Sequence, residues 1–167
     1  MIRGVTYDKQ FFKSSDFALM TKRFFRNNDG IVYGCNITNT ANTVVISKGY
    51  FATSGYYTCL SSAEVIQISK GGTLVYEIDL GKVNTDTRFE QGSFKVIDGN
   101  PVKSDLFADG LIYQYPIARF NFTNNAISNF VVLASKVFGD ENVVRKGTQP
   151  PDNSVGTDGD EYLQYFN

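Results

Sequence analysis

Hydrophobic and polar residues follow a helical period at one place, close to the start of the chain. Phe17, Met20 and Phe24 recur at spacings of three and four residues, which places them on one face of a helix. Ser15 precedes this run and suits the N-cap, and the Asn-Asn-Asp-Gly sequence after it is typical of a helix end. The pattern therefore predicts one helix over about residues 15–27.

Beyond this helix, apolar and polar residues alternate over short runs, as they do in half-buried strands. Leu74, Tyr76, Ile78 and Leu80 share one face of such a run, and the Gly-Gly pair before it is a hairpin signal. Turn signals recur at intervals of about 8–12 residues, which is typical of sandwiches and barrels. We expect an all-β fold, an antiparallel β-sandwich or barrel-like domain with one N-terminal α-helix and a short C-terminal strand. The expected strands cover residues 31–40, 43–47, 50–60 with a bulge or turn at Gly55, 63–69, 73–80, 92–98, 111–122 as one strand or two joined near Pro116, and 126–138.

The composition changes near residue 139. Residues 145–159 are rich in Gly, Pro, Asp and Asn and poor in apolar residues, as linkers are. Residues 161–167, EYLQYFN, again alternate like a strand. Because one isolated strand is unstable in water, we expect it to join another sheet or copies of itself. The expected parts are an N-terminal segment at 1–29, a β-rich domain at 30–138, and a linker with a terminal assembling strand at 139–167.

The aromatic residues exceed what one core needs, with 14 Phe and 10 Tyr in 167 residues. Phenylalanines on two sides of one helix cannot all face the same core, although one face could cover an open end of the domain. Along 111–122, both alternating faces are largely apolar, so that one packs on the core and the other on something else. We therefore expect copies of the chain to bind one another. The interface candidates are Phe11, Phe12, Phe25, Tyr162, Leu163 and Tyr165.

Charge and hydropathy exclude two classes of partner. A formal net charge of −1 provides no basic field for nucleic acid or an anionic membrane. No apolar run approaches the roughly 20 residues that a membrane span requires. The first residues lack the apolar region of a signal peptide, so we expect synthesis in the cytosol.

Two absences restrict the chemistry, because the chain has no His and no Trp. Without His, neither a Ser-His-Asp nor a Cys-His site can form within one chain, and two Cys are too few for a structural zinc site. We therefore expect no enzyme activity, no metal and no cofactor; a hydrolase with two acidic residues is the weakest alternative. Cys35 and Cys59 are expected to be buried free thiols, with a disulfide as the alternative. Tyrosines could stack on a sugar ring, although the strongest stacking residue is missing; the candidates are Tyr56, Tyr57 and Tyr115.

Three stretches occur in a recognisable order. A helix that ends in NNDGIVYG is followed by a strand pair, then by LVYEIDLGKVNT at 74–85, and then by the segment at 113–129 that begins YQYPIARF. This order resembles small structural proteins in the tail tips and baseplates of tailed bacteriophages, particularly those of Gram-positive hosts. The segment at 113–129 has Asn-Asn where Gly is common in that family. The C-terminal GTDGDEYLQYF also resembles a segment of phage fibre and tail proteins, through Gly156, Gly159, Asp160, Tyr162, Gln164 and Tyr165.

The resemblance covers most of the chain, and its motifs are structural and carry no catalytic signature. It implies a non-enzymatic virion protein of the tail: an adaptor that assembles as a symmetric homo-oligomer, contacts other tail or baseplate proteins and supports host attachment. The alternative is a carbohydrate-binding module that recognises host-wall polysaccharide. Both remain expectations, because a fold-level analogy does not establish a function.

Overall fold

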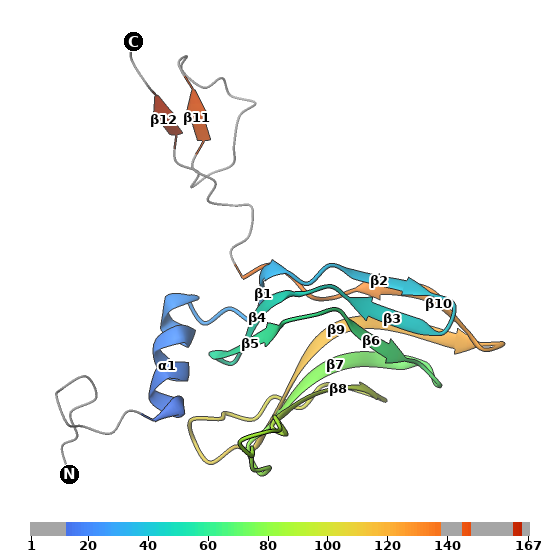
Figure 1. Cartoon of the computed structure of the whole chain (residues 1–167). Coiled ribbons are helices and arrows are strands. Elements are labelled where there is room, and N and C mark those ends of the chain that lie inside the picture. The colour runs from blue at the N-terminus through green and yellow to red at the C-terminus, as the bar shows by residue number, and fades with distance from the viewer. Residues whose placement is uncertain (1–12, 138–144, 148–161, 165–167) are drawn as a thin grey trace. The chain divides into compact units, whose positions relative to one another are not determined.

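The protein is described by a computed structural model that places residues 13–137, 145–147 and 162–164 (Figure 1). The described residues are mostly β, with three antiparallel sheets and one short helix near the N-terminus, as the sequence pattern predicts. The chain divides into two compact units, residues 1–137 and 138–167.

Two three-stranded sheets have the strand orders β1-β4-β5 and β2-β3-β6. They share one long bent hairpin, in which β1 pairs with β4 and β2 pairs with β3. β1 continues into β2, and the chain bends at Cys35, whose φ is 51° and whose backbone N–H donates to the Lys48 carbonyl at 3.2 Å. The predicted strand at 31–40 is therefore two strands. The run at 50–60 is also two strands, because Ser54 and Gly55 form a turn with φ of 47° and 82°. The bounds are β1 Gly30–Gly34, β2 Ile37–Thr40, β3 Thr43–Ile46, β4 Gly49–Thr53, β5 Tyr56–Leu60 and β6 Glu64–Gln67.

The third sheet has four strands in the order β10-β9-β7-β8. β9 runs unbroken through Pro116, which answers the question that the sequence left open. Proline cannot donate to a ladder and is tolerated at bulges, and here Leu74 pairs with Ala118 while Val75 pairs with Pro116, so Ile117 is the extra residue. The bounds are β7 Gly72–Asp79, β8 Gly92–Ile97, β9 Ile112–Thr123 and β10 Ala126–Val132.

The sheets enclose one main core and meet along one edge. In Figure 1, β7, β8 and β9 lie across from β3 and β6, and β10 lies beside β2. At this edge, the Ile127 N–H donates to the Ala41 carbonyl at 2.8 Å, and Ile31 bridges to Lys136. No closed barrel forms within the described residues. The apolar face predicted for 73–80 points into this core. The best-buried members of the cluster include Val44, Ile46, Phe51, Leu74, Tyr76, Ile78, Ala118 and Phe120.

The helix α1 spans Ser14–Phe24 and overlaps the predicted range. Its predicted apolar face is wrong, however. Phe17 and Phe24 are 54% and 71% exposed, whereas Ala18 is 2% exposed. The reason is the close approach of α1 to the β4–β5 turn, where a Cβ on Gly55 would lie 2.1 Å from the Ala18 carbonyl oxygen. Only a small side chain fits on the side of the helix that faces this turn.

The second unit contains β11, Arg145–Gly147, and β12, Tyr162–Gln164, which pair in parallel. The linker prediction was therefore wrong for residues 145–147, while 148–161 lie outside the described residues. The strand predicted near the C-terminus exists in part, and its partner is a strand of its own chain. Whether it also joins copies of the chain stays a prediction.

Candidate functional site

Strand alternation brings three tyrosines to the outer face of the β1-β4-β5 sheet. On β4, Phe51 points into the core, so Tyr50 points outward. Tyr50 pairs with Tyr33 on β1, and Tyr57 lies on the outward side of β5. Tyr33, Tyr50 and Tyr57 are 73%, 38% and 44% exposed. We call these three residues the tyrosine face.

Two of the three rings of the tyrosine face, those of Tyr50 and Tyr57, are ordered by stacking. Tyr50 and Tyr57 have ring centroids 5.4 Å apart and an interplanar angle of 20°. Tyr57 also stacks on the buried ring of Phe25, at 6.3 Å and 17°. Such contacts hold side chains in one orientation before any partner arrives. The face therefore offers a preorganised aromatic surface with hydroxyl groups, suited to packing on a protein or on a sugar ring.

A half-buried carboxylate fixes the sheet that carries the tyrosine face. Asp29 lies between α1 and β1, and its carboxylate accepts the backbone N–H of Ser54 at 2.6 Å and the hydroxyl of Tyr113 at 2.5 Å. It thus ties the β4–β5 turn to β9. Burial, followed by the bond to Asp29, raises the pKa of Tyr113 far above its usual value, so this hydroxyl stays protonated and donates.

The sugar-stacking candidates do not form one group. Tyr57 belongs to the tyrosine face, but Tyr56 is the next residue along β5 and therefore points inward, where it stacks on Phe107 at 6.3 Å. Tyr115 is 6% exposed, and its hydroxyl accepts the Ser135 backbone N–H at 3.1 Å. The assignment of Tyr56 and Tyr115 to a sugar surface was wrong, because both rings serve the core.

The interface candidates have different outcomes. Phe25 is 5% exposed and packs with Ala52 and Val137, so its ring is covered by its own chain and is not available to a partner. Tyr162 and Leu163 lie in β12, of which only the backbone is described. The remaining three candidates, Phe11, Phe12 and Tyr165, lie outside the described residues.

Sequence reasoning missed Tyr33 and Tyr50. Tyr50 could have been found, because it precedes Phe51 on one predicted strand, and successive side chains of a strand point to opposite faces. Tyr33 could not, because its outward position opposite Tyr50 depends on a register shift between Ile31 and Tyr33. No residue type in this stretch signals the shift.

The cysteines also differ from the prediction. Both are free, but only Cys35 is buried, and burial raises the pKa of its thiol. Cys59 is exposed because it lies on the outward side of β5, opposite Tyr50. A hydrogen bond with Cys59 raises the pKa of the Tyr50 hydroxyl.

A carboxylate that is fully buried lies on the outer side of the four-stranded sheet. Glu77 is 4% exposed, accepts the Gln114 side-chain amide at 2.7 Å and forms an ion pair with Lys95. Gln114 in turn accepts the Val102 backbone N–H at 2.9 Å, which ties down the segment after β8. Burial raises the pKa of Glu77, but the bonds from Lys95 and Gln114 outweigh it, so the pKa lies below its usual value of 4.5.

This network makes stability depend on acid pH. A carboxyl whose pKa is lowered by folding stabilises the fold above its unfolded pKa, and the effect disappears as pH falls through its folded pKa. We expect Glu77→Gln to cost roughly 1–2 kcal/mol at pH 7, since Lys95 is partly solvated, and to flatten the stability profile below about pH 4.5. Urea unfolding followed by circular dichroism between pH 7 and pH 3 measures this. Glu90→Gln, at an exposed ion pair with Arg88, is the control. Parallel wild-type and Glu77→Gln profiles would contradict the assignment.

The described part of the chain has no helix long and apolar enough to cross a membrane. Within the same residues, no three His, Cys, Asp or Glu side chains gather as a metal site would require. No protein family model matches the chain, and no curated protein matches it significantly in sequence.

Proposed function

We propose that this chain is a non-enzymatic structural protein of a phage virion, an adaptor of the tail tip or baseplate that assembles as a symmetric homo-oligomer and supports host attachment. The three stretches that resemble such proteins support the phage assignment. The observation that carries the assembly is the tyrosine face, with three exposed rings on one side of a small sheet.

Two physical arguments connect this surface to assembly. Aromatic residues are enriched in protein interfaces, where large rigid rings bury much area at a small entropic cost. Closed symmetric assemblies most often use one patch that meets its own copy, so a single face can suffice. A stable interface needs about 800 Å² on each partner, which is more than three rings provide. Residues of nearby strands must therefore contribute the rest of the interface.

We also propose that the sheets form a β-sandwich that is joined at one edge and open at the other. The core cluster supports this arrangement, because it combines inward residues of all three antiparallel sheets. The open edge lies between β5 and β8, where a hollow of about 270 Å³ is lined by Thr58, Tyr76 and Phe94 among others.

Size-exclusion chromatography with light scattering tests the assembly. At tens of micromolar, the wild-type chain is expected at a multiple of its 18.6 kDa mass. Tyr33→Ser and the double variant Tyr33→Ser/Tyr57→Ser are expected to lower the measured particle mass toward the mass of a single chain. Tyr33 contributes little to its own fold, because it is 73% exposed, so a loss of mass there reports on the interface. Val83→Ser, at an equally exposed apolar residue in a loop, is the control. A wild-type monomer at this concentration would refute the assembly.

A carbohydrate-binding module is the second candidate, favoured by the ordered rings of Tyr50 and Tyr57. Aromatic rings with nearby hydroxyl groups pack on the apolar faces of sugars. Glycan-array binding that disappears in Tyr57→Ala and in Tyr50→Ala, with the oligomeric mass unchanged, would favour this candidate. A lower oligomeric mass of these variants, with no glycan binding by the wild type, would favour the structural adaptor.

A further inference from the structure

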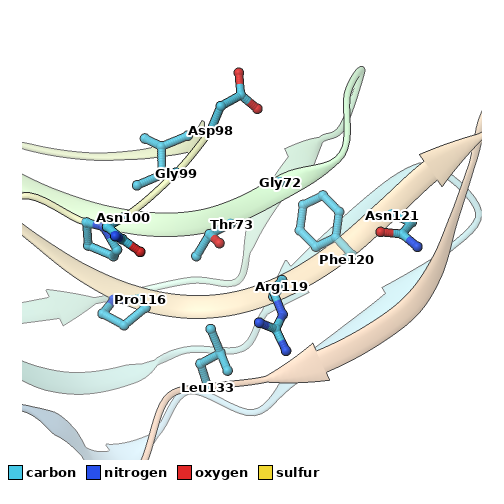
Figure 2. A pocket seen from close by; sticks show the side chains of 12 residues that line it. Gly72, Thr73, Asp98, Gly99, Asn100, Pro116, Arg119, Phe120, Asn121 and Leu133 are labelled. Atoms are coloured by element: carbon cyan, nitrogen blue, oxygen red, sulfur yellow. The ribbon is translucent and has the colours of Figure 1, made fainter.

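A separate hollow of about 540 Å³ lies on the outer side of the four-stranded sheet (Figure 2). Its walls come from the start of β7, the turn that follows β8, the middle of β9 and the residue that follows β10. We call it the Arg119 groove. Its lining residues are Gly72, Thr73, Ile97, Asp98, Gly99, Asn100, Pro101, Pro116, Arg119, Phe120, Asn121 and Leu133.

Arg119 is held in the middle of this groove by the register of the sheet. It pairs with Thr73 on β7 and with Val131 on β10. Its neighbours Ala118 and Phe120 belong to the core, so alternation directs Arg119 outward. In Figure 2 its guanidinium extends from β9 on the side of Leu133. Across residues 13–137 the guanidinium has no ion pair, in contrast to the cations of Lys70, Arg88 and Lys95.

The lining of the groove holds one cation, Arg119, and one acid, Asp98. Asp98 is the one acidic residue among its lining residues, and it is bound to Lys70 at 2.8 Å. In Figure 2 the Asp98 carboxylate points away from Arg119. The Asp98 charge is thus compensated by a cation outside the lining, and Arg119 is left as the uncompensated charge. An arginine in this situation provides a planar fork of donors for a carboxylate or a phosphate.

The groove also has neutral polar groups beside this charge. In Figure 2 the side chains of Thr73, Asn100 and Asn121 lie along the groove, with Asn100 and Asn121 toward opposite ends. None of these three side chains has a hydrogen-bond partner among residues 13–137, so their donors and acceptors remain open to a ligand. Pro116 and Leu133 supply apolar surface on which a ring or a carbon chain can lie. Ligand sites commonly combine such an apolar floor with a few convergent polar groups.

From these observations we propose that the Arg119 groove binds an anionic polyol, a sugar or sugar alcohol that bears a carboxylate or a phosphate. The anionic group pairs with the guanidinium of Arg119. The hydroxyl groups of the ligand bond to Thr73, Asn100 and Asn121, and its carbon skeleton lies on Pro116 and Leu133. The tyrosine face takes no part in this site, and the proposal is independent of the assembly.

Isothermal titration calorimetry on the full chain tests the groove, with glucuronate and glycerol 3-phosphate as anionic probes and glucose and glycerol as their neutral counterparts. The experiment uses low-salt buffer without phosphate, because salt screens an exposed charge. At least one anionic probe is expected to bind, and its neutral counterpart at least tenfold more weakly. The stronger of the two anionic probes distinguishes a carboxylate ligand from a phosphate ligand.

Variants assign the binding to the groove. Arg119→Gln is expected to lower the affinity for the anionic probe about tenfold or more, because it removes a charge-assisted hydrogen bond. Arg23→Gln, at an exposed arginine on α1, is the matched control and is expected to leave binding unchanged. The thermal midpoint and the oligomeric mass of Arg119→Gln should equal those of the wild type, which separates this proposal from the assembly. No binding of either anionic probe at tens of millimolar, or equal affinity in wild type and Arg119→Gln, would overturn the proposal.

Discussion

Replacing Leu74 by Ala is expected to lower the free energy of unfolding by about 2–5 kcal/mol, the range for deleting a buried leucine side chain. Leu74 is 0% exposed and lies on β7, between β8 and β9, where its partners are Val96 and Ala118. Its side chain belongs to the cluster that joins all three antiparallel sheets. Neighbours on a central strand are held by pairing on both sides and cannot easily fill the space. A loss in the upper half of this range is therefore expected.

Urea unfolding, followed by circular dichroism and tyrosine fluorescence, measures this loss. Val65→Ala is the matched control, because Val65 lies on a strand but is 60% exposed, and a change within about 0.5 kcal/mol is expected there. Both proteins should be compared at one concentration, since assembly would add to apparent stability. Equal losses for Leu74→Ala and Val65→Ala would contradict the assigned core.

Removal of the Asp29 carboxylate is the second large effect. Asp29→Ala is expected to cost about 2–4 kcal/mol, because it breaks two hydrogen bonds and leaves the N–H of Ser54 and the hydroxyl of Tyr113 without their acceptor. Ser54 is 4% exposed, so water cannot readily replace the lost partner. The change also loosens the turn that positions the strand of Tyr57. The tyrosine face should therefore lose order together with stability.

Two further variants separate these contributions. Tyr113→Phe removes one of the two bonds and is expected to cost less than Asp29→Ala. Asp86→Ala, at an exposed acid in the loop after β7, is the control for loss of a carboxylate and is expected to be neutral. Chemical denaturation at pH 7 gives the three values. The account fails if Asp29→Ala is as neutral as Asp86→Ala.

The alkaline limb of stability gives an independent check on the same bond. The pKa of Tyr113 is raised by folding, so its protonated form stabilises the fold below the unfolded pKa of about 10, and this contribution is lost as pH rises through the folded pKa. Tyr113→Phe lacks this titrating hydroxyl. As pH rises above about 10, its free energy of unfolding, measured with urea, should therefore fall less than that of the wild type.

The strands were largely predictable from the sequence, because alternation and turn chemistry are local. Asn124 and Asn125 illustrate this, since the predicted turn forms with φ of 51° and 57°. The inward set on 111–122 was also predictable as far as the bulge: Tyr113, Tyr115 and Ile117 all pack on the core. On the opposite face, Gln114 is buried and accepts the Val102 N–H, whereas Pro116 lines the Arg119 groove.

The errors share one physical cause, because each depends on a contact between distant residues. The buried side of α1 is decided by Gly55, more than thirty residues further along the chain, and not by the helix's own apolar stripe. The position of Tyr33 is decided by its register with β4. Arg119 looked like an ordinary exposed cation in the sequence. Its importance comes from the pairing of Asp98 with Lys70, which leaves it as the groove's uncompensated charge.

The central claim is that identical chains meet through exposed aromatic surface, and an experimental structure of the assembled particle tests it most directly. Electron cryo-microscopy of the purified wild-type chain is expected to show a symmetric oligomer in which the rings of Tyr33, Tyr50 and Tyr57 are buried between subunits. An oligomer in which all three rings still face solvent, or a preparation that contains only single chains, would contradict the claim.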